Sequence, residues 1–111
     1  MDPIEDYTWL RQMLTGTVIE RFHVGAFHAV GLRLSQQKGG DATPFRFRIL
    51  LFCEGVQQPV AAYNLELSIL GSDCLTEQVG HLHRNLGHAS EEMSYPQFKA
   101  WAVEQARNLT Q

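Results

Sequence analysis

Two consecutive segments that alternate apolar and polar residues restrict the folds open to this chain of 111 residues. The segments span residues 45–53 and 60–70. Alternation with a period of two places one row of apolar side chains on one face of a β-sheet. Gly55 and Pro59 lie between the segments, and these residue types favour a turn and a strand boundary. The pattern therefore predicts an antiparallel hairpin.

The register of this hairpin is limited by burial, because a slip of one residue would turn an entire apolar row to the opposite face. Pairing Cys53 with Ala61 keeps the rows together and sets Arg48 opposite Glu66. A slide by two residues preserves the same faces and sets Arg46 opposite Glu66 instead. A cross-strand pair of opposite charge contributes only about 0.2–1 kcal/mol, so both registers stay open.

The second face of the hairpin changes from polar to apolar towards the turn. Near the turn it carries Leu50, Phe52, Val60 and Ala62. A sheet with one face in water would not place large apolar side chains there, so either a helix of the same chain or another subunit must cover them. We therefore predict a partner-binding surface formed by these four residues, with Trp101 as an interface hot spot.

The remaining segments predict two further strands and three helices. Asp2 and Pro3 favour the start of a helix that ends near residue 15. Strands are expected at 17–24 and 26–35, on either side of Gly25.

Two of the three helices are expected after the hairpin. Leu75, Val79, Leu82 and Leu86 recur at spacings of four, three and four, which is typical of an amphipathic helix. A capping box at 94–97 predicts a last helix that reaches about residue 109. The expected fold class is α+β: a four-stranded antiparallel meander sheet with one N-terminal helix and two C-terminal helices packed on it. All elements are expected to form a single domain, 1–111.

Composition excludes several classes of function. Hydrophobic residues make up 44% and charged residues 19% of the chain, as in globular proteins. The net charge of −3 provides no general basic field, so no nucleic-acid partner is expected. The apolar runs are shorter than a membrane span and residues 1–6 are acidic, which predicts no membrane contact and a cytoplasmic location.

The residue types that usually hold metals do not occur in metal-binding patterns. The two cysteines, Cys53 and Cys74, are not spaced as zinc ligands. His81, His83 and His88 fall in the expected helix over residues 75–86 or just beyond it, without the spacing of four that a helical metal site needs. We interpret them as a solvated face, and we expect neither a metal nor a cofactor.

His23 and His28 lie on the two arms around Gly25 and are expected to face each other across that turn. A catalytic pair would need a nucleophile or a carboxylate placed with them. The nearest acid, Glu20, is expected on the opposite strand face from His23. No catalytic residue is therefore predicted, and ordinary strand histidines are the favoured interpretation.

These observations favour a non-catalytic protein-binding or assembly module that self-associates as a homodimer or binds another protein. Its layout is similar in shape to that of type III secretion chaperones, although no shared motif carries the similarity. The alternative is a small-molecule or metal-binding domain, of a kind that a small enzyme would also use. In it, His23, His28 and the aromatic residues of the last helix line a pocket between sheet and helices.

Overall fold

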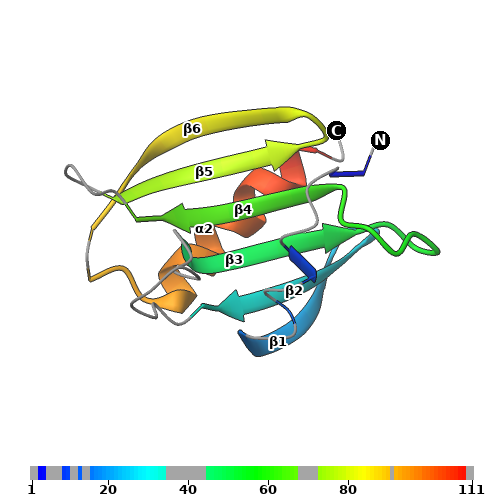
Figure 1. Ribbon diagram of the computed structural model, residues 1–111, viewed down its shortest axis with the longest axis horizontal. Helices are drawn as coiled ribbons and strands as arrows, with labels where there is room; N and C mark the ends of the chain where they lie inside the picture. The colour runs from blue at the N-terminus through cyan, green and yellow to red at the C-terminus, as the bar shows by residue number, and fades with distance from the viewer. Residues whose placement is uncertain are drawn as a thin grey trace.

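The protein is described here by a computed structural model that covers residues 3–4, 9–10, 13, 16–34, 45–67, 73–90 and 92–109. Its main feature is a six-stranded antiparallel sheet in which every strand pairs with the next one in sequence, so the sheet is a meander (Figure 1). The elements are β1 (Thr17–Val24), β2 (Phe27–Arg33), β3 (Phe45–Phe52), β4 (Ala61–Glu66), β5 (Asp73–Val79), β6 (Leu82–Ala89) and α2 (Tyr95–Asn108).

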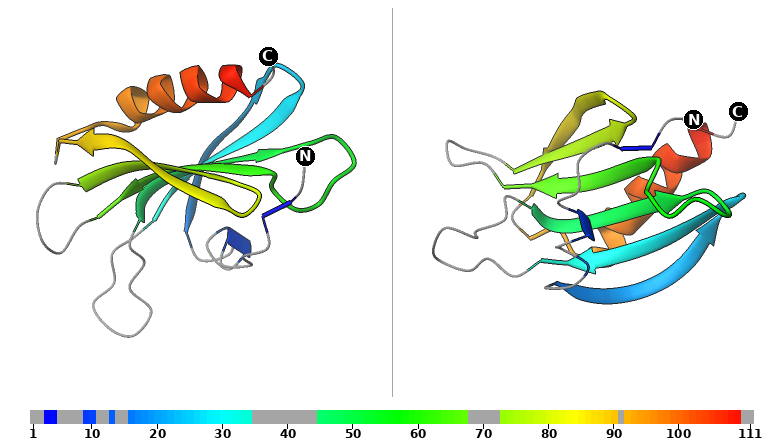
Figure 2. Two further views of the ribbon diagram at one scale, coloured as in Figure 1. Left: turned by 90° about the horizontal axis from the view of Figure 1, so that it is seen from above. Right: turned by 45° about the vertical axis from the view of Figure 1, so that its right-hand side comes forward.

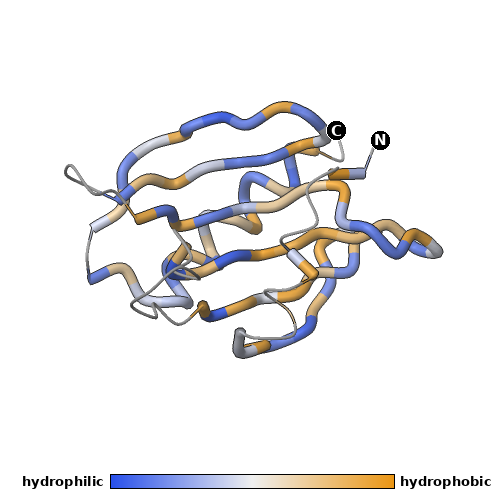
Figure 3. Tube along the Cα trace, in the orientation of Figure 1, coloured by the Kyte–Doolittle hydropathy of each residue, from blue (hydrophilic) through white to orange (hydrophobic). Residues whose placement is uncertain are grey.

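The sheet is covered on both sides by segments from opposite ends of the chain. Helix α2 crosses one side, and the N-terminal residues lie on the other (Figure 2). We call these two sides the helix face and the N-terminal face. The central strands β3 and β4 are mostly buried, whereas β6 is largely exposed and hydrophilic (Figure 3).

The helix face holds the larger apolar core. Helix α2 starts with the predicted capping box, in which Ser94 and Gln97 bond each other's backbone N–H groups. Phe98 of α2 is fully buried, which stabilises the fold by about 1.5–3 kcal/mol. Its ring lies 5.8 Å from that of Phe47. The buried members of this core are Val24, Phe27, Ala29, Phe47, Ile49, Leu51, Val60, Ala61, Tyr63, Leu65, Leu75, Ala89, Tyr95, Phe98, Ala102 and Ala106.

The N-terminal face holds a second, smaller core. Trp9 and Leu10 have helical backbone, as does Met13, while the other residues of the predicted helix over 3–15 lie outside the described part or are not helical. The Ile4 N–H donates a 2.8 Å hydrogen bond to the carbonyl of Pro59, which ties this segment to the turn after β3. The buried members of this core are Ile4, Trp9, Val30, Leu32, Leu34, Leu50 and Ala62.

The prediction of four strands and three helices is wrong at residues 75–86, where the structure has a hairpin formed by β5 and β6. Val79 pairs with Leu82, which leaves a two-residue turn that starts at Gly80 with φ 55°. Glycine at the first turn position is typical of type II′ hairpins. The spacing of four, three and four does not mark a buried stripe in this hairpin, because Leu75 is buried but Leu82 is 67% exposed.

A two-residue turn of the same kind joins β1 to β2. Val24 pairs with Phe27, and Gly25 has φ 57°. This hairpin was predicted, and the strand expected at 17–24 is confirmed as β1. The fold is therefore mostly β, and the similarity in shape to type III secretion chaperones loses the layout on which it was based.

The register of the central hairpin follows the second of the two alternatives. Leu51 pairs with Ala61, and Arg48 lies opposite Asn64 rather than Glu66. A bulge at Arg46 then shifts the end of β3 by one residue. As a result Phe45 joins the N-terminal face instead of the helix face. Burial alone did not separate the registers, because a slide by two preserves both apolar rows.

Candidate ligand-binding site

A cavity of about 440 Å³ opens on the N-terminal face beside the turn that follows β3. This volume lies within the range of about 300–1,000 Å³ that small-molecule sites occupy. The N-terminal segment, β1, β2 and the turn over 53–57 all contribute side chains to it. The cavity is therefore built from segments that are far apart in the sequence.

One side of the cavity is apolar. Trp9 and Phe52 meet edge to face with ring centroids 5.9 Å apart, and Met13 lies beside them in the same lining. We call these three residues the apolar wall. Phe52 ends β3 and is only partly buried, so its ring is shared between the core and the cavity. An apolar ligand part would contact two aromatic rings here.

The β1–β2 hairpin adds basic side chains to the lining, next to Phe52, because Phe52 pairs with His28 across β3 and β2. His23 and His28 are cross-strand partners whose ring centroids lie 4.5 Å apart at an angle of 59°. Arg21 precedes His23 by two residues, so it lies on the same strand face and also lines the cavity. We call these three residues the basic wall. The two-residue turn at Gly25 brings the imidazoles together, as the sequence predicted.

The histidine pair has no carboxylate partner from β1. Glu20 instead accepts a 2.8 Å hydrogen bond from Lys99 Nζ of α2 on the helix face. This bond holds the pKa of the Glu20 carboxyl below its usual value. The expectation that Glu20 lies away from His23 is confirmed.

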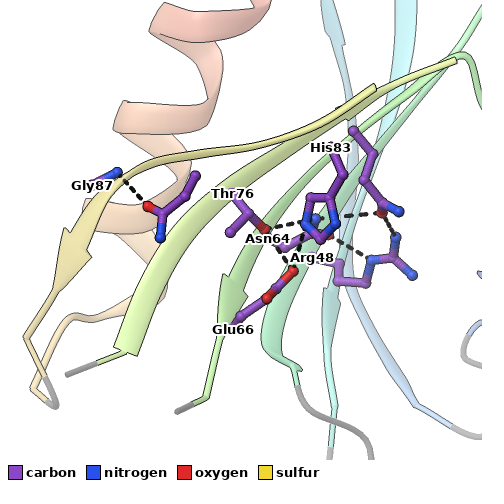
Figure 4. Close-up of polar contacts among 8 residues, drawn as sticks. Arg48, Asn64, Glu66, Thr76, His83 and Gly87 are labelled. Carbon is purple, nitrogen blue, oxygen red and sulfur yellow. Dashed lines mark hydrogen bonds and ion pairs between the residues drawn. The ribbon is translucent and has the colours of Figure 1, made fainter. Parts of the chain in front are cut away.

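A second polar group on the N-terminal face crosses four neighbouring strands (Figure 4). Arg48 donates from Nε to Asn64 Oδ1 and from one terminal nitrogen to Gln78 Oε1, each at 2.7 Å. Asn64 Nδ2 donates to Thr76 Oγ1 at 3.2 Å. We call this group, extended by Glu66 and His83, the cross-strand polar chain.

The cross-strand polar chain runs from a buried end to an exposed one. Arg48 is 2% exposed and its guanidinium lies 4.5 Å from the ring centre of Phe45. At the other end Glu66 accepts from Thr76 Oγ1 at 2.9 Å and lies 2.9 Å from His83 Nε2. Each strand from β3 to β6 contributes a side chain to the cross-strand polar chain. Its hydrogen bonds therefore support the register of these four strands. The sequence pattern did not predict these contacts, because they need the correct β3–β4 pairing and the β5–β6 hairpin.

A further ion pair lies on the helix face. Arg84 donates to the buried carboxylate of Glu77, with Nε 3.1 Å from Oε1. The ring of Tyr63 lies between this pair and α2, 5.8 Å from Trp101. Burial, and next the neighbouring Glu77, raises the pKa of the Tyr63 phenol. None of these residues lines the cavity.

The structure separates the five residues predicted to bind a partner. Leu50, Phe52 and Ala62 belong to the N-terminal face, where Ile4 and Trp9 of the same chain cover them. Val60 and Trp101 belong to the helix face.

Leu50 and Ala62 are fully buried, and Val60 is 1% exposed. The need for a cover at this end of the hairpin was correct, and the cover belongs to the chain itself.

The histidines expected on a helix lie on the β5–β6 hairpin instead. His81 is in its turn, and His83 and His88 are exposed residues of β6. Within the part of the chain that the structure describes, no group of three or more His, Cys, Asp and Glu side chains is arranged to hold a metal ion. Cys53 and Cys74 are both partly buried.

Comparisons with family models, curated proteins and solved structures found no match. In the described ranges no helix has the length and apolar character to cross a membrane. The functional interpretation therefore rests on the geometry of the site alone.

Proposed function

We propose that this protein is a binding domain for a small, largely apolar molecule that occupies the cavity on the N-terminal face. The supporting observation is the cavity of about 440 Å³ that the apolar wall and the basic wall together line. Concave sites with mostly apolar linings and a few converging polar groups are the usual form of small-molecule sites. This proposal develops the alternative reached from the sequence, with one change. The last-helix aromatics lie on the helix face and take no part.

The cavity is accessible because several of its lining side chains are exposed to solvent. Phe52 and Met13 remain partly exposed although they pack against the smaller core. Val56, on the turn at the cavity, is 39% exposed. Burying these side chains against a ligand would remove apolar surface from water, at about 25 cal/mol per Å².

Self-association stays a prediction. Its motivation was the apolar group at Leu50, Phe52, Val60 and Ala62, and residues of the same chain now account for its burial. Light scattering at micromolar concentration measures the oligomeric state directly, independently of ligand binding.

The binding proposal is tested by calorimetric titration with decanol, an uncharged probe with one apolar chain. Saturable binding at one site per chain is expected. Trp9→Leu, which removes a ring of the apolar wall, should weaken binding by about tenfold, because one aromatic contact is worth about 1 kcal/mol or more.

The other tryptophan provides the matched control. Trp101→Leu makes the same substitution on the helix face, away from the cavity, and should leave decanol affinity unchanged. Absence of saturable decanol binding to the unmodified protein, or equal losses in both variants, contradicts the proposal.

A further inference from the structure

We propose that the cavity ligand is an anionic amphiphile whose carboxylate lies against the basic wall and whose apolar chain lies against the apolar wall. This inference rests on the proposed function and adds the chemical class of the ligand. It follows from the distribution of charge and hydrogen-bond donors around the cavity. The two walls come from different parts of the chain, so each contributes a separate recognition element.

Arg21 provides a permanent positive charge at the cavity. It is an exposed residue of β1, and among the described residues it makes no hydrogen bond or ion pair. Arg48 of β3, in contrast, is committed to the fold through its bonds to Asn64 and Gln78. A cationic side chain that borders a cavity without using its donors inside the protein is available to bind an anion.

The histidine pair extends this donor set. Each imidazole has a ring N–H even when neutral, and both rings reach the cavity from adjacent strands. Their centroids are 4.5 Å apart, so two rings can approach the two oxygens of one carboxylate.

The opposing charge at the cavity is Glu54. It lies on the exposed turn after β3, and it is the one carboxylate among the described lining residues. An amine ligand would find this single partner and would face the charge of Arg21. An anion instead meets three side chains that donate hydrogen bonds. The lining therefore favours an anion over a cation.

The test compares three probes that share one apolar chain and differ only in the end group: decanoate, decanol and decylamine. Decanoate is expected to bind about tenfold more tightly than decanol, because hydrogen bonds to a charged acceptor are roughly twice as strong as neutral ones. Decylamine is expected to bind more weakly than decanol.

Substitutions then locate the end group. Arg21→Gln and the double change His23→Gln with His28→Gln should each weaken decanoate binding several-fold more than they weaken decanol binding. Arg33→Gln is the matched control, because Arg33 is an exposed arginine at the other end of β2 and does not line the cavity. It should leave the affinities for both probes unchanged.

The outcomes separate the two proposals. Decanol binding with no preference for decanoate overturns the anionic class and leaves the cavity function standing. Failure of all three probes to bind overturns the proposed function itself. A decanoate preference that survives both Arg21→Gln and the double histidine change would place the recognition elsewhere and would also overturn this inference.

Discussion

The two faces of the sheet are covered in different ways. On the helix face, a continuous helix of 14 residues packs aromatic rings onto the strands, and Phe98 and Tyr63 are fully buried. On the N-terminal face, the buried core is smaller, and a cavity and the cross-strand polar chain lie on that same face. Figure 2 shows α2 on one side of the sheet and the described N-terminal residues on the other.

This difference indicates a division of roles. A close-packed core stabilises the fold but leaves no space for a ligand. A thinner cover stabilises less and leaves accessible apolar side chains beside polar ones. We therefore expect substitutions on the helix face to change mainly stability, and substitutions around the cavity to change mainly ligand affinity.

The largest effect is expected for Phe98→Ala. Truncating this ring should lower the free energy of unfolding by about 3–5 kcal/mol, because a fully buried aromatic residue leaves a cavity that the helix cannot fill. Trp9→Ala on the N-terminal face should cost about 1–3 kcal/mol, since one side of Trp9 already borders a cavity. Urea unfolding followed by circular dichroism measures both. Equal costs would remove the proposed difference between the faces.

The second effect concerns the cross-strand polar chain. Arg48→Met should lower the free energy of unfolding by about 2–3 kcal/mol, because it leaves the buried oxygen of Asn64 and that of Gln78 without their donor. Arg33→Met changes an exposed arginine of β2 and should stay within about 0.5 kcal/mol. An unchanged free energy of unfolding in Arg48→Met would show that the cross-strand polar chain contributes nothing to stability.

The third effect sharpens the description of the helix face. A Cβ atom at Gly31 would overlap the Tyr95 hydroxyl group, so Gly31→Ala should cost about 1–3 kcal/mol. Tyr95→Phe removes that hydroxyl, whose oxygen is buried without a hydrogen-bond partner among the described residues. In the Tyr95→Phe background the cost of Gly31→Ala should fall. A double-mutant cycle of thermal unfolding measures this coupling, and a zero coupling energy would exclude the proposed contact.

The smallest effect depends on pH. The Lys99 ammonium lowers the pKa of Glu20 in the folded protein, so the folded state binds this proton less readily than the unfolded chain. The resulting stability is present above the unfolded pKa of about 4.3 and is lost as pH falls through the folded pKa.

Lys99→Met should therefore flatten the acid side of the stability curve by about 0.2–1 kcal/mol. Urea unfolding between about pH 7 and pH 3 measures this change. An unchanged pH dependence would show that the Glu20–Lys99 bond does not link β1 to α2 in solution.

Sequence patterns identified those parts of the fold whose signals are local. The capping box at Ser94 and the glycine turn at Gly25 each depend on a few adjacent residues, and both were predicted correctly. The turn at Gly80 has the same chemistry, but the leucine spacing around it also fits a helix. Periodicity over a short apolar segment does not separate a helix from a hairpin.

The candidate site was only partly predictable for a different reason. The proximity of His23 and His28 follows from their positions around one turn. The contacts of Trp9 with Phe52 and of Arg48 with Asn64 depend instead on the cover of the N-terminal face and on the exact register of β3. Both are decided by long-range packing, which a single sequence does not specify.

The most direct test uses the two tryptophans, one on each face. Trp101→Phe leaves Trp9 as the only tryptophan, and Trp9→Phe leaves Trp101. Titration with decanoate should change the fluorescence of Trp9 saturably and leave that of Trp101 constant, because only Trp9 lines the cavity. A response from Trp101 with none from Trp9 would contradict binding on the N-terminal face.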